Sequence, residues 1–280
     1  MRLNPVLPVA ALVLLAGCAA SAPRQAAPAK PDSTAATAMR PAGEGYLPDD
    51  AYDVLRVMPP APVRGDARDD ADRRIFRETR VFKDSPRWQL AHDDADLRMT
   101  SLLKDFACSL DVDVLPEQAP RLVRLLEFAL RDTARGAGIA KDHYQRLRPF
   151  RIDDGPTCLP PESLARSFDY PSGHATAGWT AGLVLAQVAP AQATAVLARG
   201  RAIGESRIVC GVHNASAVTA AQFAAGAVVA MASVTPAYRA DLDAARAEYA
   251  QLDRAAKTRP DAAACRAEAE LVALPVLPAR

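Results

Sequence analysis

The sequence predicts an all-α protein, and three observations carry that prediction. Half of the 280 residues are hydrophobic but only 5% are aromatic, and alanine dominates. Alanine-rich, aromatic-poor sequence favours closely packed helices over sheets. Apolar residues recur at intervals of three and four along most of the chain, as they do on one face of a helix. No stretch alternates apolar and polar residues as a half-buried strand does, so we expect a helical bundle.

The expected helices follow one another with prolines and glycines between them. A proline-rich lead-in covers residues 45–65, and helical periodicity begins near Asp66. The clearest amphipathic helix has Pro116 near its start and glycines past its end. A glycine and three prolines predict a loop over residues 151–170. The predicted helical segments are 69–82, 88–110, 116–138, 139–150 (ended by Pro149), 175–188, 191–207, 215–234 and 238–257.

One long stretch carries no charge at all. From Ile208 to Tyr238 the chain has no Asp, Glu, Lys or Arg, which indicates burial. Its helix, residues 215–234, is long and apolar enough to resemble a membrane span. It is rich in alanine rather than leucine, with serine, threonine and glutamine interspersed. We therefore interpret it as a core helix of a soluble bundle.

The N-terminus is interpreted as a targeting segment. Arg2 precedes an apolar stretch of 12 residues, which is too short for a membrane anchor. The sequence Leu-Ala-Gly before Cys18 resembles a bacterial lipoprotein cleavage box, so we predict a signal peptide over residues 1–18 and a lipidated Cys18. Ordinary cleavage near residues 19–22 is the alternative. Residues 19–44 predict a disordered tether, and residues 45–280 a single helical domain in the periplasm, tethered to the outer membrane by this lipid alone.

The remaining cysteines and the net charge indicate which bonds and ligands to expect. An exported protein with four further cysteines is expected to form two disulfides, and the sequence leaves all three pairings open. No Cys/His spacing indicates structural zinc. The formal net charge of +1 does not indicate binding to nucleic acid, which usually needs a strongly basic surface. The four cysteines are Cys108, Cys158, Cys210 and Cys265.

Three short segments carry the candidate chemistry. Lys141 and Arg148 lie seven residues apart, which predicts two turns along one helix face. The sequence Pro-Ser-Gly-His at residues 171–174 precedes an apolar helix, whose first N–H groups suit an anion. Arg207 precedes His213 within an apolar stretch, where a buried arginine needs an anionic partner. Each segment alone has an ordinary structural explanation.

Together the segments describe a phosphoryl-transfer site that needs no metal and no cofactor. Three cations can neutralise the non-bridging oxygens of a phosphoryl group. One histidine can attack phosphorus while the other protonates the leaving oxygen. We therefore predict a substrate with a transferable phosphoryl group.

The pattern K-x6-RP, PSGH and SR-x5-H resembles the bacterial class A non-specific acid phosphatases of the type-2 phosphatidic acid phosphatase and vanadium haloperoxidase superfamily. The resemblance extends through "GYLP", "SPRWQLA", "DHYQRLRPF" and "GESRIVCGVH", over roughly residues 45–250. It implies an all-α bundle, a homodimer and phosphate monoesters as substrates. It also implies that His213 is the nucleophile and that His174 is the general acid, which favours acidic pH. The implied phosphate-binding residues are Lys141, Arg148, Ser172, Gly173 and Arg207.

One position departs from the family pattern. The family continues with an aspartate four residues after the nucleophilic histidine, where this chain has Ala217. That aspartate orients the imidazole, so we expect its loss to weaken turnover by about 10² to 10⁴. Ser216 or water is expected to replace part of its role. The alternatives are a catalytically dead lipoprotein that binds phosphate or another oxyanion and, less favoured, a vanadate-dependent haloperoxidase.

Overall fold

The structure, a computed structural model, describes residues 44–255 and 258–277. Within those ranges it contains helices and turns but no strand, so the all-α prediction is confirmed. The predicted signal peptide, Cys18 and all of the predicted tether except Glu44 lie outside the described residues. All of the described helices belong to one compact unit.

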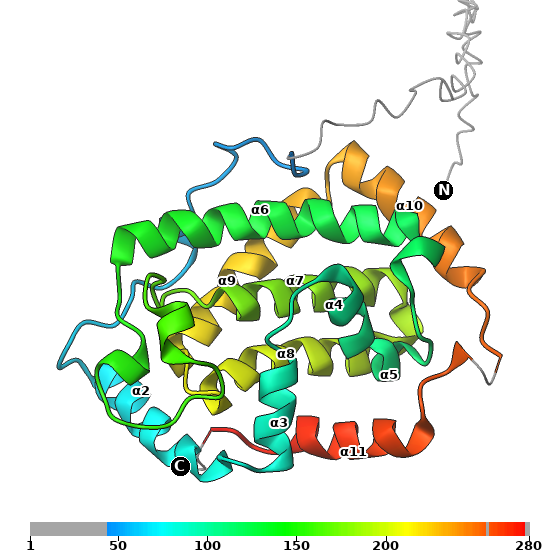
Figure 1. The fold of residues 1–280 in the computed structure, drawn as a ribbon. Helices are drawn as coiled ribbons and strands as arrows, with labels where there is room; N and C mark the ends of the chain where they lie inside the picture. Colours follow the sequence, from blue (N-terminus) through cyan, green and yellow to red (C-terminus); the bar gives the residue numbers. More distant parts are fainter. Residues whose placement is uncertain (1–43, 256–257, 278–280) are drawn as a thin grey trace, which may run out of the picture. The chain divides into compact units, whose positions relative to one another are not determined.

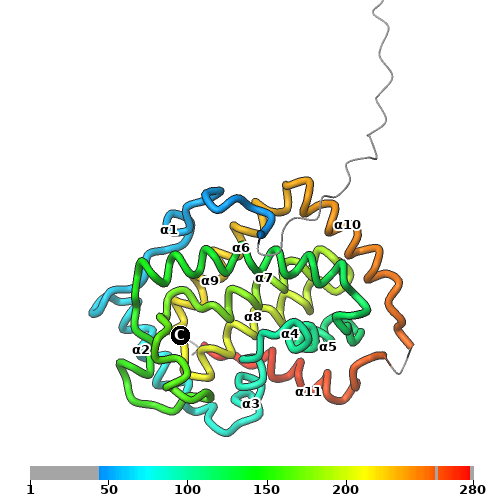
Figure 2. The backbone as a smooth tube through the Cα atoms, turned by 45° about the horizontal axis from the view of Figure 1, so that its top comes forward, coloured from blue at the N-terminus to red at the C-terminus, as the bar shows by residue number. Residues whose placement is uncertain are grey.

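Five long helices form the centre of this unit, and α7 is the one that the others surround (Figure 1). α7 (Gly173–Val188) packs against α6 (Pro120–Tyr144) and against α8 (Ala193–Val209). α9 (Ala215–Ala232) and α10 (Pro236–Ala250) also contact both α6 and α7. A second view shows the same order of layers, with α11 beyond α8 (Figure 2).

Shorter helices cover this centre. The predicted helix over residues 88–110 is wrong as a single element, because the chain breaks after Asp93. The next helix begins only at Met99, and in the turn between them the Asp96 carboxylate accepts the N–H of Arg98. The short α-helices are α1 (Val54–Val57), α2 (Ala67–Glu78), α3 (Pro86–Asp93), α4 (Met99–Asp105), α5 (Ala107–Leu110) and α11 (Ala262–Ala273). The 3-10 turns cover Thr79–Phe82, Pro116–Gln118, Pro149–Arg151, Pro161–Leu164 and Pro190–Gln192.

A helix end was also predicted in the wrong place. α6 runs unbroken through the two glycines that the sequence analysis placed past its end. Gly136 is a packing position instead: a Cβ there would lie 2.3 Å from the Tyr52 hydroxyl oxygen. That hydroxyl donates to the carbonyl of Asp132, one turn earlier in α6. Glycine therefore serves close approach here rather than helix termination.

The end of α6 determines where the first motif lies. The helix stops at Tyr144 because Gln145 adopts a left-handed conformation, with φ of 47°. Lys141 stays in the last turn of α6, whereas Arg148 lies beyond it. The prediction that Lys141 and Arg148 share one helix face, with residues 139–150 as a separate helical segment, is therefore wrong. The turn brings Arg148 back toward the start of α9 instead.

Glycines let α7 and α8 approach closely. A Cβ added to Gly200 would lie 2.8 Å from the carbonyl oxygen of Gly178, and one added to Gly178 would lie 2.5 Å from Ile203. No side chain fits at either position. Because the two helices are antiparallel neighbours, this glycine seam holds the start of α7 beside the end of α8, where Arg207 lies.

α9 is the uncharged helix that the sequence analysis assigned to the core. By length and composition it is the one helix of the described chain that could cross a membrane. Half of that span is buried within the protein, and the helix packs against α6, α7 and α8. These contacts support the interpretation as a core helix.

Both expected disulfides are present. Cys158 pairs with Cys210, which ties the loop after Arg148 to the end of α8. Cys108 pairs with Cys265 across 157 residues and ties α11 to α5. None of the residues in α11 is buried, so this covalent bond is a major part of what attaches the helix.

Candidate active site

His213 lies in the turn between α8 and α9 and is only 3% exposed. Its Nε2 lies 2.9 Å from Nη1 of Arg148. A guanidinium can only donate hydrogen bonds, so Nε2 must accept and the ring proton must sit on Nδ1. Nδ1 in turn lies 2.8 Å from the carbonyl oxygen and 3.0 Å from the carboxylate Oδ1 of Asp169. The ring therefore presents the lone pair of Nε2 on the Arg148 side.

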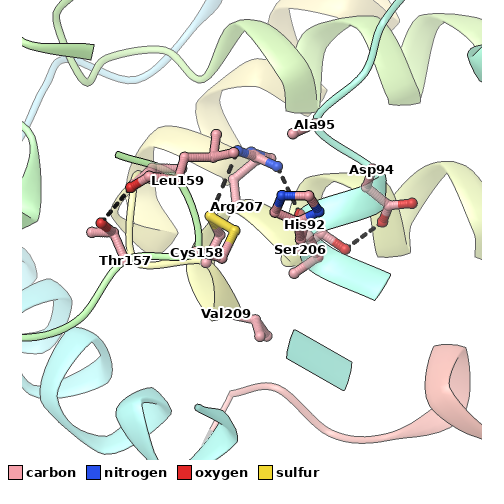
Figure 3. The surroundings of a disulfide bond; sticks show 12 residues. His92, Asp94, Ala95, Thr157, Cys158, Leu159, Ser206, Arg207 and Val209 are labelled. Carbon is pink, nitrogen blue, oxygen red and sulfur yellow. Dashed lines mark hydrogen bonds between the residues drawn. A yellow bond between two sulfur atoms is a disulfide. The ribbon is translucent and has the colours of Figure 1, made fainter. Parts of the chain in front are cut away.

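Three cations near His213 have no carboxylate partner among residues 44–255 and 258–277. Arg148, which is 5% exposed, donates to the carbonyls of Ser167 and Val212. Arg207, which is 1% exposed, donates to the carbonyl of Ala91, and its Nε has no hydrogen-bond partner. Lys141 donates to the carbonyl of Phe168. Figure 3 shows Arg207 beside the disulfide cysteine Cys158.

Two of the other buried arginines pair with carboxylates: Arg199 pairs with Asp94, Asp105 and Glu268, and Arg146 also pairs with three carboxylates. The third, Arg87, has no direct carboxylate partner in the described chain, but it donates to the Ser206 hydroxyl, which in turn donates to Asp94. An unpaired buried cation is costly unless an anion joins it. Burial lowers the pKa of Lys141 to about 8, and it lowers the pKa of Arg207 to about 10. The arrangement is therefore suited to a bound anion such as a phosphate group.

The three cations and His174 all act electrostatically on His213. Burial lowers this pKa well below its usual value, and the charges of Arg148, Lys141 and Arg207 lower it further, with a smaller contribution from His174. The imidazole is therefore neutral, which a nucleophile requires. The structure brings together both histidines and all three cations that the sequence analysis named.

His174 lies in the first turn of α7. Its Nε2 lies 3.0 Å from the carbonyl oxygen of Ala95, so that nitrogen carries a proton. Burial lowers the pKa of His174 to about 4, and the charge of Arg207 contributes. A bound phosphate dianion would oppose that charge and raise the pKa.

Ser172 and Gly173 start α7 as the sequence analysis expected. Ser172 is fully buried and caps the helix, with its hydroxyl oxygen 3.4 Å from the N–H of Ala175. Its own N–H donates to the carbonyl of Ala217. Gly173 is the first helical residue, where N–H groups have no partner within the helix.

A pocket of about 460 Å³ adjoins these groups. Lys141, Gly173 and His174 line one part of it. Most of its other lining is apolar and comes from α4, α6 and α7. The lining residues include Leu97, Leu102, Leu130, Ala134 and Ala137.

Comparison with known proteins decides the family. Residues 125–241 match the PAP2 superfamily. An acid phosphatase of Zymomonas mobilis is 38% identical over 218 residues, which cover 77% of this chain and 82% of that protein. A non-specific acid phosphatase of Providencia stuartii is 31% identical, over 73% and 84% of the two chains. The chain belongs to the non-specific acid phosphatases of the PAP2 superfamily. A relative from Salmonella typhi is 29% identical over 77% of this chain and 86% of its own length.

This acid phosphatase family member has a buried carboxylate at the site that the sequence analysis missed. Asp169 is fully buried and lies between Phe168 and the Pro-Ser-Gly-His motif. Its Oδ1 accepts from Nδ1 of His213 and from the N–H of Asn214, and its Oδ2 accepts from Nδ2 of Asn214. The one signal in the sequence was a lone acidic residue directly beside the motif.

Arg146 connects Asp169 to the rest of the phosphatase. Its guanidinium lies 2.8 Å from Asp69 and 2.9 Å from Asp72, both on α2, and 3.4 Å from Asp169. Ser216 also joins this cluster: its N–H and its hydroxyl both donate to Asp72. The Ser216 side chain therefore faces α2 and Arg146, and the expectation that it replaces the missing aspartate at His213 is not supported.

We expect Arg146→Gln to destabilise the protein by about 3 to 5 kcal/mol, because it leaves three buried carboxylates without their shared cation. Arg246→Gln is the matched control, because Arg246 is 47% exposed and pairs with the exposed Asp243. That change should cost about 0 to 1 kcal/mol. Urea unfolding measures both variants, and equal midpoints would contradict the prediction.

Proposed function

We propose that this protein hydrolyses phosphate monoesters without a metal, through a phosphohistidine on Nε2 of His213. One observation carries the proposal: Arg148, Arg207 and the partly buried Lys141, none with a carboxylate partner in the described chain, act on a neutral histidine whose Nε2 carries no proton. The cations supply the charge stabilisation for which many phosphoryl-transfer enzymes use Mg²⁺.

The reaction takes two steps at this site. Nε2 of His213 donates its lone pair to phosphorus while the bond to the leaving oxygen breaks, and His174 transfers a proton to that oxygen. Water then attacks the phosphohistidine and gives a proton to His174, so that the N–P bond breaks and inorganic phosphate leaves. His174 also lines the largely apolar pocket, which therefore suits the leaving group.

We expect His213→Ala to reduce hydrolysis of p-nitrophenyl phosphate to background at pH 5, because it removes the nucleophile. His174→Ala lacks the proposed general acid. It should therefore form a labelled phosphoenzyme only from substrates whose leaving oxygen departs without being protonated. His92→Ala is the control, because the His92 side chain is 54% exposed and its ring contacts Asp93 rather than a candidate site residue. Wild-type activity should survive EDTA. Wild-type hydrolysis equal to that of His213→Ala would instead favour a non-catalytic phosphate-binding protein.

The pH dependence follows from His174. A general acid must be protonated, and the protonated fraction of His174 falls as pH rises through its pKa of about 4 in the free protein. Bound phosphate offsets the charge of Arg207 and raises that pKa, so activity extends to higher, still acidic pH. NMR titration should show the His174 ring titrating at higher pH with inorganic phosphate than without it. An unchanged or lower titration midpoint would contradict this account.

We further propose that the protein is exported to the periplasm, as a homodimer and with a lipid on Cys18. The two disulfides support export, because such bonds persist in oxidising compartments. In a Gram-negative host, the full-length chain should fractionate with membranes and Cys18→Ser should appear in the soluble periplasm. Wild-type protein in the soluble periplasmic fraction would refute the lipid anchor. Gel filtration tests whether the protein is a homodimer.

A further inference from the structure

The side chain at position 217 cannot orient the nucleophile. Ala217 is completely buried on α9 and packs in an apolar cluster with Tyr170 and Ala140. The family pattern would place a carboxylate here. We propose that Asp169, from the loop before α7, is the positioning carboxylate of His213, so that the substitution at position 217 does not leave the site impaired. This inference rests on the proposed function.

The contacts at Nδ1 support two separate effects. The backbone carbonyl of Asp169, at 2.8 Å, can by itself hold the proton on Nδ1. The Oδ1 carboxylate oxygen, at 3.0 Å from the same nitrogen, adds a negative charge. When Nε2 bonds to phosphorus and Nδ1 keeps its proton, the imidazole becomes positively charged. The carboxylate therefore stabilises a charge that appears only during the reaction.

That negative charge matters because the surroundings of His213 are cationic. Arg148, Lys141 and Arg207 all disfavour a positive imidazole. Asp169 is the carboxylate in hydrogen-bond contact with the ring. Without it, formation of the cationic phosphohistidine would be opposed by the charges that bind the phosphate. The expected loss is therefore in turnover rather than in phosphate binding.

The Asp169 carboxylate is itself fixed by contacts with Asn214 and Arg146. The N–H and side-chain amide of Asn214, at the start of α9, donate to both carboxylate oxygens. Arg146 faces it from the turn after α6, and that guanidinium also pairs with Asp69 and Asp72 on α2. Burial raises the pKa of Asp169, and the charge of Arg146 and the donors of Asn214 oppose that rise. These donors stabilise the ionised carboxylate and fix its direction.

The first test compares two buried carboxylates. We expect Asp169→Asn to lower kcat for p-nitrophenyl phosphate by about 10² to 10⁴, as loss of an orienting aspartate does in a catalytic triad. KM and the affinity for inorganic phosphate should change less than about threefold, since the cations remain. Asp241→Asn is the control: Asp241 is buried and paired with Arg124, remote from His213. It should leave kcat unchanged in folded protein.

Either of two results would overturn the role of Asp169. One is a kcat within threefold of wild type for folded Asp169→Asn. The other is an equal loss of turnover and of phosphate affinity, which would indicate collapse of the site. Ala217→Asp adds a sharper arm: we expect no gain in kcat, because the positioning carboxylate is already present. A manyfold gain would show that Asp169 does not act as one.

A second readout does not depend on activity. In ¹⁵N NMR at pH 6 to 7, His213 should carry its proton on Nδ1, with a strongly downfield proton signal. Asp169→Asn should move that signal upfield, because a charged acceptor is replaced by a neutral one. An unmoved signal would overturn the inference. If wild type shows no turnover but this signal moves, the proposed function fails while the positioning contact stands.

Discussion

The burial of positive charge without carboxylate partners is the constraint on which this structure depends. Desolvating an ion costs several kcal/mol unless an opposite charge compensates it, and Arg148 and Arg207 are both almost fully buried. Backbone carbonyls take the place of carboxylates around them. The glycine seam sets α7 close against α8, and the Cys158–Cys210 disulfide ties the loop that holds Ser167 to the end of α8. The fold thus retains cations that would otherwise move toward solvent.

The positive charge of the three cations lowers the pKa of the two histidines to different extents. His213 is neutral because the cations and burial both disfavour its protonated form. His174 experiences a smaller effect, and its ring hydrogen bonds to a backbone carbonyl that favours protonation. A phosphate dianion bound beside these rings would oppose the positive charge at both of them. The substrate would then help to create the protonation state that the proposed cleavage requires.

The sequence predicted the helical class and the convergence of the three segments, because periodicity and motif spacing are local properties. It misplaced Arg148, because a single left-handed residue, Gln145, ended the helix and redirected the chain. The disulfide pairing could not be read from spacing, since it depends on which loops meet. Asp169 was missed because its role depends on a contact with His213, 44 residues later in the chain. Contacts between residues of different loops are the part of a site that cannot be predicted from a single sequence.

At the pocket beside His174, different helices supply the phosphate-binding groups and the apolar lining. The groups proposed to hold the phosphoryl group come mainly from the start of α7, the end of α8 and the loops beside them, whereas much of the apolar lining comes from α4 and α6. Lys141 and Gly173, both proposed to bind phosphate, also line this pocket. Substitutions along α4 and most of α6 can therefore change which alcohol the enzyme releases without disturbing the bond-breaking groups. In such an architecture, substrate preference can diverge among descendants while the chemistry is inherited unchanged.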